Sequence, residues 1–223
     1  ALEAELKAEE LGHEVERQQG AAAASGATSS AAKTAGEVAK LLDDPAMSAI
    51  VLNVQKQLEG GEASGGELSE SAREMHELAA KLRAEGKENE ADEVEKLAVQ
   101  LDDAARLKLE AEQKDAQKAA HDKLAQAAEG GHALATKLRA DNPELADAVE
   151  EVATKADQLL GGEHADVGEL RGALEDAKSV VERLRKGGLE EEAKEMEELV
   201  KQLEAALEAE LKAEELGHEV ERQ

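Results

Sequence analysis

One eighteen-residue segment occurs twice in this chain, and longer stretches repeat as well. Residues 1–18 (ALEAELKAEELGHEVERQ) recur unchanged at residues 206–223. Residues 81–101 also match residues 183–203, an offset of 102 positions. Self-similarity at a fixed offset is the signature of repeat architectures, in which each unit buries its apolar face against a neighbour. The pattern predicts a copied segment at 1–18, a first repeat at 19–121 and a second repeat at 122–223.

The spacing of apolar residues predicts helices along nearly the whole chain, because they recur every three or four positions and nowhere alternate as in a strand. Prolines after Asp or Asn and pairs of glycines interrupt this pattern. We expect an all-α fold of elongated tandem helical bundles, with three or four helices per repeat, joined by long continuous helices. The predicted helices cover residues 1–42, 45–59, 67–85, 88–129, 132–140, 143–160, 167–186 and 189–223.

The composition limits both the core and the partners. The chain has no Phe, Tyr, Trp or Cys, so Leu, Val, Ile, Met and Ala must fill the core, and neither disulfides nor thiolate chemistry is available. The formal net charge of −26 disfavours nucleic acid and anionic membrane surfaces. It indicates a solvated acidic surface, with a basic partner as the alternative. No apolar run is long enough for a membrane span and no signal peptide is recognisable, so we expect a soluble protein of undetermined compartment.

Two stretches resemble known bundle repeats. The segments KLRAEGKENEADEVEKLAVQLDDAARL (81–107) and LRGALEDAKSVVERL (170–184), with the DP and NP stops, are similar to vinculin and α-catenin repeats, and secondly to spectrin repeats. This resemblance implies helical bundles that accept an amphipathic helix in a groove. The chain departs from both families: Lys40–Leu41 and Lys137–Leu138 stand where vinculin-type repeats carry an aromatic residue, and the core Trp of spectrin repeats is missing. The duplicated segment, absent aromatics and Gly-Gly pairs together indicate an engineered protein.

The motif with the most chemical content is Glu-x-x-His, which occurs as Glu10–His13 and Glu215–His218. This spacing places a carboxylate and an imidazole on one helix face, and di-iron and di-manganese bundles use two such pairs. The segment AEELGH is also similar to the ligand helix of manganese catalases. A metal- or haem-binding bundle using these four residues is therefore one hypothesis, and solvated ion pairs are the other.

The first predicted helix carries an unusual stripe on one face. Its small central residues allow three interpretations: close approach of a neighbouring helix, a cavity beside His13 for a flat ligand such as haem, or a loosely formed helix. The stripe consists of Leu2, Leu6, His13, Gly20, Ala24, Ala31, Val38 and Leu42.

No other motif predicts catalysis, because the chain has no nucleophile elbow and no phosphate-binding loop. The histidines at 76, 121, 132 and 164 have no partner at ligand spacing in the sequence. We therefore expect a structural or scaffold protein that is not an enzyme, with no catalytic, cofactor-binding or metal-binding residue assigned and no cofactor. Its partner would be itself or another helical protein, rather than nucleic acid, a membrane or a small-molecule substrate. The alternatives are a helix-accepting binding module and the metal- or haem-binding bundle.

Overall fold

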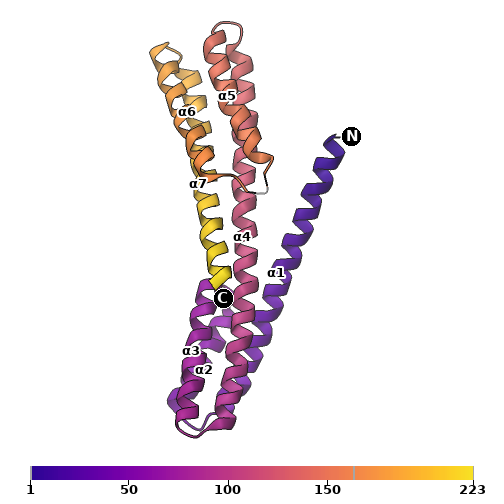
Figure 1. Ribbon diagram of the computed structural model, residues 1–223, viewed down its shortest axis with the longest axis vertical. Coiled ribbons are helices and arrows are strands. Elements are labelled where there is room, and N and C mark those ends of the chain that lie inside the picture. Colours follow the sequence, from indigo (N-terminus) through magenta and orange to yellow (C-terminus); the bar gives the residue numbers. More distant parts are fainter. Residues whose placement is uncertain (1, 163, 223) are drawn as a thin grey trace. The chain divides into compact units, whose positions relative to one another are not determined.

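The computed structural model describes residues 2–162 and 164–222, and it describes side-chain surroundings from residue 12 onward except at residue 13. Over these residues the chain forms seven helices and no strand, which confirms the all-α fold class (Figure 1). The helices are α1 (Leu2–Leu41), α2 (Pro45–Gly60), α3 (Gly65–Ala84), α4 (Glu88–Leu138), α5 (Pro143–Leu160), α6 (Val167–Lys186) and α7 (Glu190–Arg222).

The helices form two compact units. Unit 1 contains Ala1–Lys114 and Leu216–Gln223, and unit 2 contains Asp115–Glu215. The boundary lies inside α4, seven residues before the predicted repeat boundary at 121/122. The end of α7 belongs to unit 1, although the repeat pattern in the sequence assigns it to the second repeat. Thus α4 and α7 each contribute residues to both units.

Several helix starts follow directly from local sequence. Asp44 accepts hydrogen bonds from the backbone N–H groups of Ala46 (2.8 Å) and Met47 (3.4 Å), and Pro45 occupies the first turn of α2. Ser64 and Glu67 form a reciprocal capping box at the start of α3, in which the Ser64 N–H donates to the Glu67 carboxylate at 2.8 Å. These caps fix the ends of the first two hairpin connections, as the sequence predicts for the DP stop.

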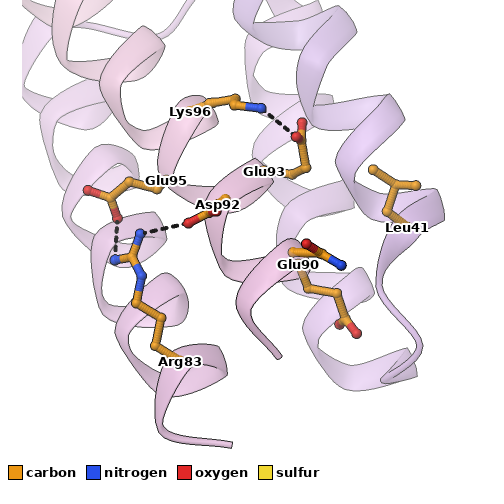
Figure 2. Close-up of a pocket in the computed structure, with 8 residues that line it drawn as sticks. Leu41, Arg83, Glu90, Asp92, Glu93, Glu95 and Lys96 are labelled. Carbon is orange, nitrogen blue, oxygen red and sulfur yellow. Dashed lines mark hydrogen bonds and ion pairs between the residues drawn. The ribbon is translucent and has the colours of Figure 1, made fainter. Parts of the chain in front are cut away.

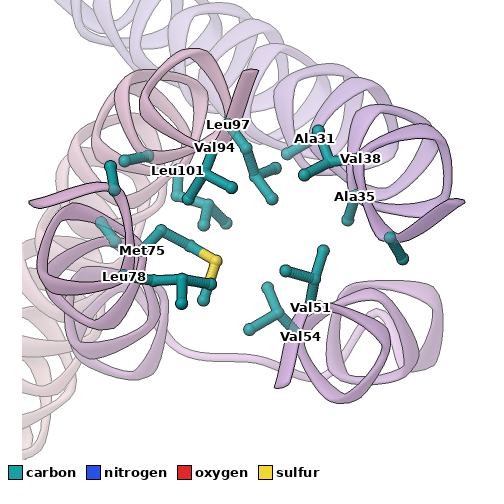
Figure 3. Packing of buried hydrophobic residues seen from close by; sticks show 14 of the residues in the cluster. Ala31, Ala35, Val38, Val51, Val54, Met75, Leu78, Val94, Leu97 and Leu101 are labelled. Carbon is teal, nitrogen blue, oxygen red and sulfur yellow. The ribbon is translucent and has the colours of Figure 1, made fainter. Parts of the chain in front are cut away.

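The core of unit 1 is aliphatic and draws on four helices (Figure 3). Ala31, Ala35 and Val38 of α1 point toward Val51 of α2 and Met75 of α3, and all five side chains are buried. The alanines of α1 therefore fill part of a packed core, which agrees with the close-approach interpretation of the stripe. Of the predicted stripe, Ala24, Ala31, Val38 and Leu42 are buried and Gly20 is half-buried, whereas the side chains of Leu2, Leu6 and His13 lie outside the described residues.

The predicted break at Gly130–Gly131 is wrong, because α4 continues through both glycines to Leu138. A Cβ atom on Gly130 would lie 2.6 Å from Leu199 Cδ2, and one on Gly131 would lie 2.7 Å from Ala153 Cβ. These glycines therefore allow α7 and α5 to approach α4 closely inside unit 2, rather than turning the chain. The second core draws on the later part of α4 and on α5, α6 and α7.

Candidate functional site

The Glu-x-x-His pairs of the metal hypothesis are not brought together by any described contact. His218 Nδ1 lies 3.8 Å from Glu221 Oε2, and both side chains are exposed. Its predicted partner Glu215 is exposed as well. The side chains of Glu10 and His13 lie outside the described residues. Among the residues that are described, no group of three His, Asp or Glu side chains is arranged to hold a metal ion.

The structure instead gives a role to His76, which sequence reasoning left without a partner. Its Nε2 lies 2.8 Å from Asp102 Oδ2, and its Nδ1 lies 3.2 Å from Glu95 Oε1. Seven positions along α3 from His76, Arg83 reaches Asp92 at 3.3 Å and Glu95 at 3.5 Å. We call this arrangement a charge clamp: two basic residues seven apart on one helix pair with two acidic residues seven apart on the next helix.

The same charge clamp joins α4 to α5 in unit 2. His132 Nε2 lies 2.7 Å from Asp157 Oδ2, and its Nδ1 lies 3.1 Å from Glu150 Oε1. Arg139 follows seven positions later, directly after the last residue of α4, and lies 3.9 Å from Glu150 and 3.8 Å from Asp147. Each group in the α3–α4 clamp therefore has a counterpart of the same residue type in the α4–α5 clamp.

A third charge clamp joins α6 to α7, with lysine in the place of histidine. Lys178 Nζ lies 2.8 Å from Glu204 Oε1, and Arg185 pairs with Glu197. In all three clamps the earlier basic residue meets the later acidic residue, as antiparallel helices require. Residues seven apart lie on the same helix face, two turns from one another. Three helical hairpins thus share one pattern of cross-helix contacts.

The clamps that contain His76 and His132 form both of their histidine hydrogen bonds only when the imidazole is protonated. Carboxylate oxygens only accept hydrogen bonds, so an imidazole that bonds two carboxylates must donate from both ring nitrogens, which only the imidazolium does. The hydrogen bond to Asp102 is the largest cause that raises the pKa of His76 above its ordinary value. The hydrogen bond to Asp157 does the same for the pKa of His132, and partial burial opposes the effect at both sites.

An open pocket lies where α1 and α3 end and α4 begins in unit 1 (Figure 2). Its lining is acidic and includes Glu90 and Glu93, beside the exposed side chain of Leu41. In unit 2 the equivalent acidic residues of α7 are Glu192 and Glu195, and both pair with Lys137 of α4, at 3.4 Å and 2.7 Å.

One difference between the two units at this point is Leu41, which stands in unit 1 where unit 2 has Lys137. Leu41, the last residue of α1, precedes the buried Leu42, and Lys137 precedes the buried Leu138, the last residue of α4. The buried Oε2 of Glu90 has no hydrogen-bond partner among the described residues. In unit 1 Lys96 pairs with Glu93 at 2.5 Å, and Leu41 stands where the lysine that reaches both glutamates stands in unit 2.

In unit 2 the carboxyl group of Glu210 is buried. The Glu210 side chain is 4% exposed, and its Oε1 lies 3.7 Å from Nδ1 of the exposed His164. Gln117 Nε2 lies 3.2 Å from the same imidazole nitrogen. Burial raises the pKa of Glu210, nearby His164 opposes this rise, and Glu214 adds to it. Nothing in the sequence marks this group, because burial of one Glu among many depends on the tertiary fold.

The charge clamps did leave a signal in the sequence. His76 and Arg83, like His132 and Arg139, stand seven apart, and acidic pairs with the same spacing occur on the next helix. Metal ligands on one helix are spaced within a single turn, so a search at ligand spacing misses these pairs. The signal that finds them is a repeated seven-residue spacing of basic residues.

Comparison with known protein families, curated proteins and solved structures finds no match to this chain. Among the described helices, none has both the length and the apolar character needed to cross a membrane.

Proposed function

We propose that this chain is a structural helical-repeat protein, a scaffold that carries out no catalytic reaction. The observation that supports the proposal is the charge clamp, which recurs in the α3–α4, α4–α5 and α6–α7 hairpins with the same spacing and register. Recurrence in three places is expected of a device that sets how hairpins pack. A catalytic or ligand site, in contrast, needs its groups in one place.

The chemistry of the clamp residues agrees with this role. Of the histidines whose side chains are described, His76 and His132 have the closest carboxylate neighbours, and their ring nitrogens are engaged in contacts between helices. Both side chains are 39% exposed, so water still reaches them. A general acid or base is usually tuned by desolvation in a cleft, and these histidines lie instead along helix seams.

A charge swap tests whether the clamp acts through packing alone. Lys178→Glu or Glu204→Lys alone places like charges across the α6–α7 seam and should reduce the free energy of unfolding by about 0.2–1 kcal/mol. The double variant Lys178→Glu/Glu204→Lys restores opposite charges and should recover most of that loss. Urea unfolding followed by far-UV circular dichroism measures both. Failure of the double variant to recover would contradict a role that depends only on matching charge.

Ligand titration tests the proposal against the metal and haem alternatives. A ligand present at one hundred times its Kd stabilises a folded protein by about 2.7 kcal/mol. For a protein of this size that raises Tm by roughly 5–10 °C. We expect no such shift with Co(II), Mn(II), Fe(II) or haemin. A shift that disappears in the His13→Ala/His218→Ala variant would favour the metal-binding or haem-binding bundle instead.

A second candidate, a module that accepts a helix, is supported by one observation. The end of α1 and the α2 helix of unit 1 expose large apolar side chains: Leu41 is 55% exposed, and Ile50 and Leu52 are 43% exposed each. The net charge of −26 would select a basic amphipathic helix. Titration of a lysine-rich amphipathic peptide, with Ile50→Ser/Leu52→Ser as the control, separates the two functions. Binding that the control abolishes would favour the module over the scaffold.

A further inference from the structure

The two identical segments have different surroundings. In the copy at 206–223, Leu216 is buried at 8% exposure, and Gly217 packs on α4 of unit 1. A Cβ atom on Gly217 would lie 2.7 Å from Gln113 Nε2. Two residues further along α7, Glu219 Oε2 lies 4.0 Å from the Cβ position of Gly66 at the start of α3. The end of α7 thus covers a surface of unit 1 marked by Gly66 and Gln113, which we call the α3–α4 surface.

The copy at 1–18 leaves the corresponding face open where it is described. Gly12 has the sequence position of Gly217, but it is exposed and no described atom lies within 4 Å of its Cβ position. Val15 has the position of Val220; its side chain is 50% exposed, whereas Val220 is half-buried. At these two positions the same residue therefore packs more closely in α7 than in α1.

We propose that the segment at 1–18 of one molecule binds the α3–α4 surface of a second copy of this chain, in place of that copy's own residues 216–222. This occupant has the same sequence as the present one, so each contact made by the end of α7 has an equivalent. Gly12 would face Gln113 as Gly217 does, and Leu11 would take the buried position of Leu216.

Residues 216–222 of the same molecule bind the α3–α4 surface more readily than residues 1–18 of a second molecule. Residues 216–222 are attached to the molecule that carries the surface, and attachment through a short connection gives an effective concentration in the millimolar range. The segment of a second molecule is present only at its bulk concentration. The exchange therefore favours the monomer in dilute solution, and a dimer forms when the attached segment is weakened.

The first experiment weakens one segment at a time. Leu216→Glu places a charge in the buried position of α7 and should release residues 216–222, which leaves the surface to residues 1–18 of a second copy. In light scattering coupled to size exclusion, we expect the mass of this variant to double from the 23.6 kDa of one chain as concentration rises. The matched control Leu11→Glu should remain a monomer, and so should the double variant Leu11→Glu/Leu216→Glu. A Leu216→Glu variant that stays monomeric, or a double variant that still dimerises, would overturn the proposal.

The second experiment locates the contact and does not depend on how well Leu216→Glu folds. The chain has no cysteine, so a Gly12→Cys chain and a Gln113→Cys chain each carry a single thiol. Mixed at high concentration and oxidised gently, they should form a Gly12→Cys to Gln113→Cys disulfide heterodimer in preference to either homodimer. Mixing Val99→Cys, at an exposed position of α4, with Gly12→Cys gives the background level. A heterodimer yield no greater than this background would rule the exchange out.

Discussion

Replacing Leu41 by lysine should stabilise unit 1, although it removes an apolar side chain. Leu41 lines the acidic pocket with Glu90 and Glu93, in the place where Lys137 pairs with Glu192 and Glu195 in unit 2 (Figure 2). The substitution Leu41→Lys would supply the corresponding cation in unit 1. Lys137 Nζ lies 3.4 Å from Glu192 in unit 2, so by analogy we expect the new lysine to reach Glu90, whose Oε2 has no partner among the described residues.

The size of the expected stability gain for Leu41→Lys can be worked out from the structure. Leu41 is 55% exposed, so its replacement loses less than half of the roughly 1.5–3 kcal/mol that full burial of a leucine contributes. The lysine stem recovers most of this loss by covering the same apolar neighbours. A new exposed ion pair adds about 0.2–1 kcal/mol, and a partner for a buried polar atom adds about 1–3 kcal/mol. The net gain is about 1–2 kcal/mol, which corresponds to a Tm increase of roughly 3–6 °C.

Thermal and urea unfolding followed by far-UV circular dichroism measure this gain, because the chain has no Trp or Tyr to report by fluorescence. The gain should shrink at high salt, which screens exposed charges. Leu41→Gln, a polar control without charge, should not stabilise, and Glu90→Gln should remove most of the benefit of Leu41→Lys. If Leu41→Lys is no more stable than the parent chain, or if Glu90→Gln leaves the gain intact, the equivalence between the two units is wrong.

Three further predictions concern single groups. The folded-state pKa of His76 is raised, so its clamp contributes stability that is fully present below about pH 6.5, the unfolded value, and is lost as pH rises through the folded pKa. His76→Lys, which copies Lys178 of the third clamp, should remove the contribution of His76 to the pH dependence of the urea midpoint and leave that of His132. Gly65→Ala should cost about 1–3 kcal/mol, because its Cβ would lie 2.9 Å from the backbone N of Leu109, whereas Gly66→Ala should be neutral or slightly stabilising. Glu210→Gln should stabilise the protein by about 1 kcal/mol at pH 7 and have little effect at acidic pH, where the buried carboxyl is already neutral.

For each of these three predictions, one experimental outcome would contradict the reasoning. An unchanged pH profile in His76→Lys would show that the clamp histidine does not titrate with folding. Equal unfolding free energies for Gly65→Ala and Gly66→Ala would mean that α3 and α4 are not in close contact at that point. A loss of stability in Glu210→Gln at neutral pH would indicate that the carboxylate, rather than the carboxylic acid, is the form that the fold favours.

Local sequence was enough to predict most helix ends. Pro45 after Asp44 starts α2 where the DP stop predicted, since the carboxylate bonds the first free N–H groups of the helix. The same reasoning gave a wrong prediction at Gly130 and Gly131, because two glycines are equally consistent with a turn and with a close helix crossing. Only the tertiary neighbours Leu199 and Ala153 distinguish these cases.

The charge clamps could not be predicted from the sequence for a different reason. The chain has 53 Asp and Glu residues, so a carboxylate seven positions from another is common and carries little information by itself. The basic pair of each clamp, such as His132 and Arg139, carries more information, because basic residues are less frequent in this chain. The register that brings that pair to Glu150 and Asp157 depends on a hairpin turn whose length the sequence does not reveal. Once one hairpin is known, the other two can be found from the sequence.

The continuity of α4 across the boundary between Lys114 and Asp115 has a consequence for how the protein loses its structure. Helix formation is cooperative, so a helix that melts on one side of a boundary removes hydrogen-bond partners from the first turn on the other side. Unfolding of one hydrophobic core should then promote unfolding of the other, as happens between neighbouring units of a repeat protein. Amide hydrogens on both sides of position 114 should therefore exchange with similar protection, as parts of one opening event rather than two.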